Sequence, residues 1–309
     1  MKTEIGKSMH TLKAKKLRFY ILGVALPVVQ ILIFYFYANF NSILLAFQDY
    51  NGSSFDFVGF DNFVGIFNGT HPRLTKFNMG YILKNSFLSF GMELLFGSLP
   101  AILFSYYIYK KYPAAGAFKI ILYIPHIIPS IIFVILYKYF VGSAIPEIYE
   151  KLTGENLFHM FDGVNVERTR ALLIFFTIYI SFGTRILLYT GTMSGISESI
   201  IESAKLDGIT PMKELFLIVI PMIWGTIVTF IVVSIVGLFT GQMSAYSFFG
   251  EGLEMQLYTF GYYLFMRASK ASMYEYPVLS ALGLIMTAIA VPVTLAVKHF
   301  MTKYGPSVD

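Results

Sequence analysis

The feature that most constrains this chain is a series of six long apolar stretches. A helix needs about 20 predominantly apolar residues to cross the hydrocarbon core of a membrane. The whole chain is 56% hydrophobic and 13% charged, whereas soluble domains carry about 25% charged residues. The predicted spans lie at about 19–46, 86–109, 118–140, 171–192, 215–239 and 278–297. We therefore expect an all-α, polytopic membrane protein with one membrane domain at 19–301, between tails at 1–18 and 302–309.

The first span is expected to remain part of the protein rather than to be removed as a signal peptide. Its apolar run is too long, and no small-residue cleavage pattern follows it. The chain has no cysteine, which excludes disulfides, thiolate catalysis and cysteine metal sites.

Basic residues indicate the orientation of the spans, because lysine and arginine are enriched in cytoplasmic segments. The N-terminal tail contains Lys2, Lys7, Lys13, Lys15, Lys16 and Arg18. We therefore expect both termini and the loops after the second and fourth spans to be cytoplasmic. The longer segments, at about 47–85, 141–169 and 240–277, would then lie outside. The net charge of +5 is explained by this topology and does not indicate nucleic-acid binding.

A polar segment, "ESAKLDGITPMKELFLIVIP" (202–221), interrupts the apolar pattern before the fifth span. Ser199 and Glu202 have the spacing of a capping box, so a short helix is predicted to begin at Ser199 and to run to Asp207. One face of this helix is apolar, because three residues recur at intervals of four: Ile196, Ile200 and Ala204.

The residues after this helix predict a turn and a second helix. Gly208 is suited to the left-handed conformation that ends a helix. Thr210 is a suitable N-cap, and Pro211 fits the first helical position, where its missing N–H is not needed. The resulting helix–turn–helix could lie on the membrane surface or dock in the groove of a partner protein. The residues alone do not choose between these contacts.

The spacing of this segment resembles the cytoplasmic signature of permeases from binding-protein-dependent ABC importers. That signature is Glu-Ala-Ala, a spacer, Asp-Gly, nine residues and Ile-x-Leu-Pro. The matching residues are Glu202, Ala204, Asp207, Gly208, Phe216, Ile218 and Pro221, and the departures are Ser203, Ile209 and Ile220. In that family the segment, here about 197–213, is the coupling helix that docks in a cleft of the ATP-hydrolysing subunit. The resemblance assigns this role to Glu202, Ser203, Ala204, Asp207, Gly208, Pro211 and Pro221, with Gly208 making the turn and the two prolines giving rigid transmission.

Other stretches resemble the carbohydrate branch of these permeases, of the maltose or glycerol-phosphate type. They are "FVGFDNFVGIF" (57–67), "LYIPHIIPSIIFVILYKYF" (122–140), "YISFGTRILLYTGTMSGI" (179–196) and "YEYPVLSALGL" (274–284). A departure is Ser197, where the family usually has proline. The resemblance implies the type I (MetI-like) importer fold in a prokaryotic inner or plasma membrane. It also implies a second, different permease, two ATP-binding subunits and an external solute-binding protein that delivers carbohydrate, such as an oligosaccharide.

Two alternatives to carbohydrate import remain open. One is a permease for another solute, such as glycerol-phosphate or a peptide-like nutrient. The other is a secondary transporter, which would need midplane carboxylates for a coupling ion or an inverted repeat.

The sequence contains no GxxxxGK[ST] loop, so this chain cannot hold a nucleotide by that device. ATP and Mg²⁺ are therefore expected in a partner ATPase, and this chain is expected to need no cofactor or metal and not to be an enzyme.

Charged side chains inside a membrane are costly and are candidates for function. Glu93 and Arg185 fall inside predicted spans, where they could pair with a neighbouring span or line the pathway. Sugars bind to aromatic faces and polar groups, so a solute pathway is predicted along the fourth and fifth spans. Its candidate residues are Tyr179, Ser181, Thr184, Ser234, Thr240 and Gln242. The alternative is that the hydroxyl groups among them bond to carbonyls of their own helices.

Overall fold

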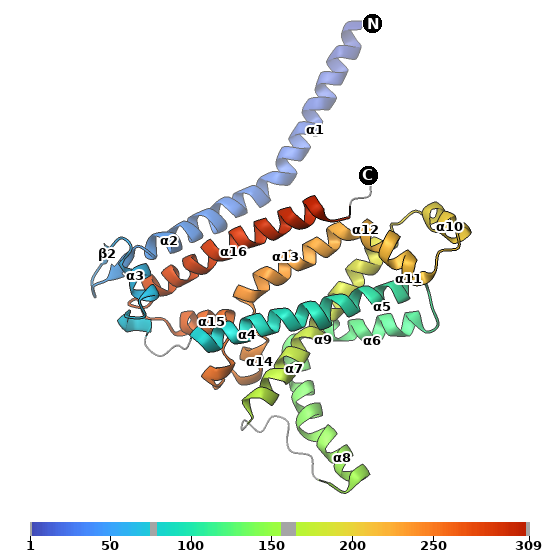
Figure 1. The fold of residues 1–309 in the computed structure, drawn as a ribbon. Helices are drawn as coiled ribbons and strands as arrows, with labels where there is room; N and C mark the ends of the chain where they lie inside the picture. Colours follow the sequence, from blue (N-terminus) through green and yellow to red (C-terminus); the bar gives the residue numbers. More distant parts are fainter. Residues whose placement is uncertain (1, 75–78, 156–164, 307–309) are drawn as a thin grey trace. The chain divides into compact units, whose positions relative to one another are not determined.

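The structure is a computed structural model that describes residues 2–74, 79–155 and 165–306. Figure 1 shows the fold and labels its α-helices and strand β2. The chain forms two compact units, Met1–Thr75 with Ala271–Ile285, and Lys76–Lys270 with Met286–Asp309. In the described part of the chain, five helices are long and apolar enough to cross a membrane, or six if a bent helix pair forms one span.

The first unit begins with a long helical segment. Helix α1 (Lys2–Gln30) continues through a π-helix, η1 (Ile31–Tyr37), into α2 (Ala38–Leu45). The candidate span is Lys15–Leu45, and none of the described side chains in its most apolar stretch is buried. The segment predicted as a tail is thus helical and continuous with the first span.

A short β-hairpin follows this helix within the mostly helical fold. Strand β1 (Gln48–Tyr50) pairs antiparallel with β2 (Phe55–Phe57), and α3 (Asp61–Phe67) and the 3-10 helix η2 (Pro72–Leu74) come next. Asn62 in α3 is buried and donates from Nδ2 to the carbonyls of Ala46 (3.0 Å) and Gln48 (2.7 Å). The buried amide of Asn62 therefore holds α3 to the end of α2 and to the first strand of the hairpin.

The second unit is organised around α9 (Val166–Met193), the fourth span. The second span runs from Met79 to Tyr109 as α4 (Met79–Met92), a π-helix η3 (Glu93–Ser98) and α5 (Leu99–Tyr109). It begins seven residues before the predicted start at 86. Helix α9 also packs closely on α6 (Ala115–Ile127), because a Cβ at Gly183 would lie 3.0 Å from the carbonyl oxygen of Leu122.

The predicted third span, at 118–140, consists of two helices with a break between them in the structure. Helix α6 ends at Ile127, Ile128 is extended (φ −74, ψ 132), and α7 (Ser130–Tyr139) starts after Pro129. Pro129 favours this break, because proline disfavours the helical region for the residue before it. Helix α7 continues through a π-helix, η4 (Phe140–Ala144), into α8 (Ile145–Thr153), so the long apolar helix here is Ser130–Thr153.

The predicted fifth span, at 215–239, is a bent pair of helical segments in the structure. Helix α11 (Pro211–Glu214), the π-helix η5 (Leu215–Val219) and α12 (Ile220–Met222) form its first half, and α13 (Trp224–Thr240) forms the second. The halves meet at Ile223 with a bend of 72°. Pro221 lies two residues before the bend, and a proline inside a helix removes a backbone hydrogen bond and favours a kink.

Three short helices follow α13, namely α14 (Ala245–Phe249), the 3-10 helix η6 (Met255–Leu257) and α15 (Phe260–Lys270). The buried amide of Asn85 on α4 donates to the carbonyls of Gln256 and Tyr258, both at 2.9 Å. Arg170 on α9 donates from Nε to the Asn85 amide oxygen at 2.7 Å. Two spans therefore fix the position of this segment. The last helix, α16, is Tyr276–Tyr304.

Candidate functional site

The predicted helix–turn–helix is present at 198–214. Helix α10 (Glu198–Leu206) is followed by Gly208 with φ +73, and α11 begins with Pro211 after an extended Thr210. The predicted start at Ser199 is wrong by one residue, because Ser197 is the extended residue before the helix (φ −61, ψ 131) and Ser199 lies in its first turn. The hydroxyl groups of Ser197 and Ser199 lie 2.8 Å apart and hydrogen-bond to each other. No side-chain cap bond is present at Ser197.

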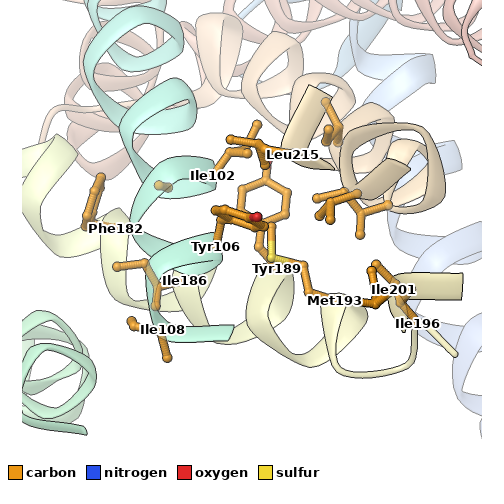
Figure 2. Close-up of a cluster of buried hydrophobic side chains, with 14 residues drawn as sticks. Ile102, Tyr106, Ile108, Phe182, Ile186, Tyr189, Met193, Ile196, Ile201 and Leu215 are labelled. Carbon is orange, nitrogen blue, oxygen red and sulfur yellow. The ribbon is translucent and has the colours of Figure 1, made fainter. Parts of the chain in front are cut away.

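One side of α10 is packed against the rest of the unit. Ile201 and Ala204 are buried, as is Ile196 just before the helix. Ile200, which was predicted to share this face, is 39% exposed, because the residues that turn toward the core are 201 and 204. Figure 2 shows Ile196 and Ile201 close to Met193 at the end of α9. The apolar face is therefore filled by the protein itself and is not free to lie on a membrane.

The opposite side of α10 is exposed. Glu202, Ser203, Asp207 and Gly208 all lie on the surface, and Leu206 is 89% exposed. Among the other residues assigned to coupling, Ala204 is buried in the core, Pro211 is exposed and Pro221 is half-buried beside the bend. The helix thus presents charged side chains and the large apolar side chain of Leu206 outward from a packed base.

An open cleft of about 420 Å³ lies between α10 and the ends of α5 and α9. It is lined by Tyr109, Lys110, Lys111, Ser194, Ile196, Glu198, Ile201, Glu202 and Lys205. In the described part of the chain, no group of three or more His, Cys, Asp or Glu residues is placed to hold a metal ion.

Two polar contacts join the helix–turn–helix to the second span, and sequence reasoning missed both. Lys110 Nζ lies 2.8 Å and 2.9 Å from the two carboxylate oxygens of Glu214. The hydroxyl of Tyr106 donates to the carbonyl of Pro211 at 3.0 Å. In the sequence, Lys110 is explained by topology alone, and the only signal for Glu214 is an acidic residue at the start of an apolar span.

The two intramembrane charges form an ion pair. Arg185 on α9 binds the carboxylate of Glu93 at the start of η3, and its side chain is 4% exposed. The guanidinium also donates to the hydroxyl groups of Ser98 (2.5 Å) and Ser234 on α13 (3.2 Å). A Cβ at Gly97 would lie 3.0 Å from Arg185 Nη1, so the glycine leaves room for the guanidinium. The second, fourth and fifth spans meet at this cluster.

The six predicted pathway residues are not gathered at one site. The hydroxyls of Ser181 and Thr240 donate to carbonyls of their own helices, as the alternative interpretation has it. Thr184 Oγ1 lies 3.2 Å from Nδ1 of His126. Tyr179 is half-buried and stacks on Phe175 with ring centroids 6.1 Å apart. Of the remaining two, Ser234 belongs to the Arg185 cluster, and Gln242 is half-buried just after α13.

Comparison with known proteins gives one family and several relatives. The family described as "Binding-protein-dependent transport system inner membrane component" matches residues 77–308. The chain is 24% identical over 305 residues to the polygalacturonan/rhamnogalacturonan transport system permease protein YteP of Bacillus subtilis (strain 168), covering 93% of this chain and 88% of that protein. It is 21% identical over 211 residues to the arabinooligosaccharides transport system permease protein AraP of the same organism, covering 68% and 65%.

The fold is also similar to that of a solved structure. A chain in the crystal structure of a bacterial alginate ABC transporter, in complex with an alginate pentasaccharide-bound periplasmic protein, superposes with a TM-score of 0.74 and 20% identity. The match covers 96% of this chain and 99% of that one. The similarity extends over the whole helical architecture described above.

Proposed function

This chain belongs to the family of binding-protein-dependent transport system inner membrane components, and from that premise we propose that it is the permease subunit of an ATP-driven importer for carbohydrate. The relatives named for polygalacturonan, rhamnogalacturonan and arabinooligosaccharide transport support an oligosaccharide as the solute. The observation that carries the proposal is the helix–turn–helix at 198–214, whose base is packed and whose outer face is free.

The outer face of α10 is the surface that we assign to the ATPase. Glu202, Asp207 and the exposed Leu206 combine charge with an apolar side chain, which suits a helix that docks in a groove of a partner. ATP and Mg²⁺ belong to that partner. In this proposal the helix–turn–helix and both termini are cytoplasmic, in the inner or plasma membrane of a prokaryotic cell.

The assembly that we propose contains two different permeases, two ATP-binding subunits and an external solute-binding protein. ATP binding draws the ATPase subunits together, and each carries a coupling helix with it, so that the permease pair turns from an inward-facing to an outward-facing state. The binding protein then releases solute into the pathway, and hydrolysis restores the inward-facing state.

The solute pathway is proposed to include Tyr179 and Gln242. Both side chains are half-buried, and an aromatic ring and an amide are groups that suit the apolar faces and hydroxyl groups of a sugar. The hydroxyl groups of Ser181 and Thr240 already bond within their helices, so they are weaker candidates.

The experiment is uptake by the complete complex in proteoliposomes, with its solute-binding protein and a panel of oligosaccharides. We expect co-purification with an ATPase and uptake that requires ATP. Charge reversal by Glu202→Lys with Asp207→Lys should uncouple hydrolysis from uptake, whereas Glu251→Lys, at an exposed site away from α10, serves as the matched control.

Two results would contradict the proposal. Normal ATP-driven uptake by the double reversal would remove the coupling role of α10. Uptake driven by an ion gradient without an ATPase would instead indicate a secondary transporter.

A further inference from the structure

We infer that Lys110 and Glu214 are positioning residues that fasten the helix–turn–helix to the second span, so that a displacement of α10 moves α5 with it. The inference rests on the proposed function, because it concerns how motion produced by an ATPase enters the membrane domain. It concerns two residues other than those that we assign to the ATPase.

Glu214 is held in a fixed orientation. It lies at the end of the short helix α11 with a side chain that is 3% exposed, and its N–H donates to the carbonyl of Thr210 at 2.8 Å. Both carboxylate oxygens accept from Lys110 Nζ, whose side chain is 15% exposed. Hydrogen bonds between ionised groups are shorter and stronger than neutral ones. The contact therefore resists both sliding and rotation of α11 against the end of α5.

Tyr106 provides a second contact one helical turn away from Lys110. Its hydroxyl donates to the carbonyl of Pro211 at 3.0 Å, and its ring lies 5.8 Å from Lys110 Nζ. The side chain is buried in the apolar core between α5, α9 and η5, which Figure 2 shows around Tyr106, Tyr189 and Leu215. Two contacts at different points of α5 fix the direction of α11 as well as its position.

The Lys110–Glu214 ion pair is directional, whereas the packing of the apolar core is not. Apolar packing is non-directional, so the core holds the elements together but permits small rotations of one against another. Replacing a buried ion pair by apolar residues is often neutral for stability or even stabilising, so net stability is a poor explanation for this pair. A fixed geometry between α11 and α5 explains it better.

The Lys110–Glu214 contact is connected, through the second span, to the Glu93–Arg185 ion pair. Helix α5 is continuous through η3 with α4, and Glu93 at the start of η3 pairs with Arg185 on α9. Motion passed from Glu214 to Lys110 therefore enters the same helical span that carries the intramembrane charge cluster. Without the pair, apolar contacts and the Tyr106 hydroxyl would have to transmit the motion to this span.

The test compares uptake with ATP hydrolysis in the full reconstituted complex. The variants are Glu214→Gln, Lys110→Met, and the exchange Lys110→Glu with Glu214→Lys. In assembled complexes of each single variant, solute uptake per ATP hydrolysed should fall about fivefold or more, the lower end of typical coupling between sites. The exchange should restore part of that ratio. Lys270→Met and Glu251→Gln, in an exposed pair of the same unit, should leave it unchanged.

A purely structural role would change the amount of assembled complex but not uptake per ATP hydrolysed, and that result would overturn the inference. If the single variants do not assemble, Lys110→Met with Glu214→Leu removes the ion pair without leaving a buried charge, and an unchanged ratio in that double variant would overturn the inference too. Wild-type complex without ATP-driven uptake would contradict the proposed function itself, whereas normal wild-type coupling with unaffected variants would contradict this inference alone.

Discussion

Replacing Glu93 by leucine is expected to destabilise the protein, because it leaves the guanidinium of Arg185 buried without a carboxylate. The side chain of Arg185 is 4% exposed, and its remaining side-chain partners in the described part of the chain are neutral: the hydroxyls of Ser98 and Ser234 and the ring of Phe230. Removing one partner of a buried ion pair costs about 3–5 kcal/mol. The Glu93 side chain is itself 19% exposed, so we expect a loss near the lower end, about 3 kcal/mol.

The double variant Glu93→Leu with Arg185→Met distinguishes a paired charge from two independent ones. Removing both charges avoids the uncompensated guanidinium, so most of the lost stability should return. Thermal unfolding in detergent can be followed by the fluorescence of the single tryptophan, Trp224, whose Nε1 donates to the carbonyl of Met301. Ser98→Ala is the control, since it removes one neutral partner and should cost about 1 kcal/mol.

The expected order of unfolding temperatures, from highest to lowest, is wild type, the double variant and Glu93→Leu. Additive losses in the double variant would refute the pairing argument. Solute uptake by the double variant then distinguishes a structural role of the Glu93–Arg185 pair from a role in the pathway. Normal uptake by a stable double variant indicates a structural role, whereas lost uptake by the same variant indicates a role in the pathway.

Three further predictions concern the turn, His71 in the first unit and the pathway. Gly208→Ala should lower stability by about 1 kcal/mol, because alanine must adopt φ +73 there, and Gly208→Asn should cost less; equal unfolding temperatures for all three proteins would contradict this. Burial and the neighbouring Arg73 guanidinium lower the pKa of His71 below its usual 6.5, so the unfolded chain takes up a proton more readily as pH falls. Stability contributed by the neutral imidazole should be complete above about pH 6.5 and lost below it, and His71→Gln should flatten unfolding curves measured between pH 7.5 and 5.5. Tyr179→Ala and Gln242→Ala should reduce uptake while leaving complex assembly intact, and unchanged uptake would exclude both from the pathway.

Local chemistry in the sequence was sufficient for the helix–turn–helix. The left-handed conformation of Gly208 and the place of Pro211 at the first helical position depend on local backbone preferences, and the structure has both. The burial of Ile201 in place of Ile200 depends instead on where α10 meets α9, which residue spacing within one helix cannot specify.

Contacts between distant segments could not be predicted from the sequence. Lys110 pairs with Glu214 across about a hundred residues, and a charge at the end of a span satisfies the topology rule whether or not it has a partner. The 72° bend at Ile223 is similar, because a proline permits a kink and the surrounding helices decide its angle. Arg185 was identified as a charge inside a span, but its approach to η3 depends on the missing side chain of Gly97.

The bent fifth span has a consequence for how this protein can vary. The second span contacts it on both sides of the bend, at Glu214 through Lys110 and near Ser234 through Glu93 and Arg185. Each residue added to a helix advances it by about 1.5 Å and rotates it by about 100°. Inserting or deleting one residue between Glu93 and Lys110 would therefore turn one of these side chains away from its partner. This segment is constrained more strongly in its length than in its composition.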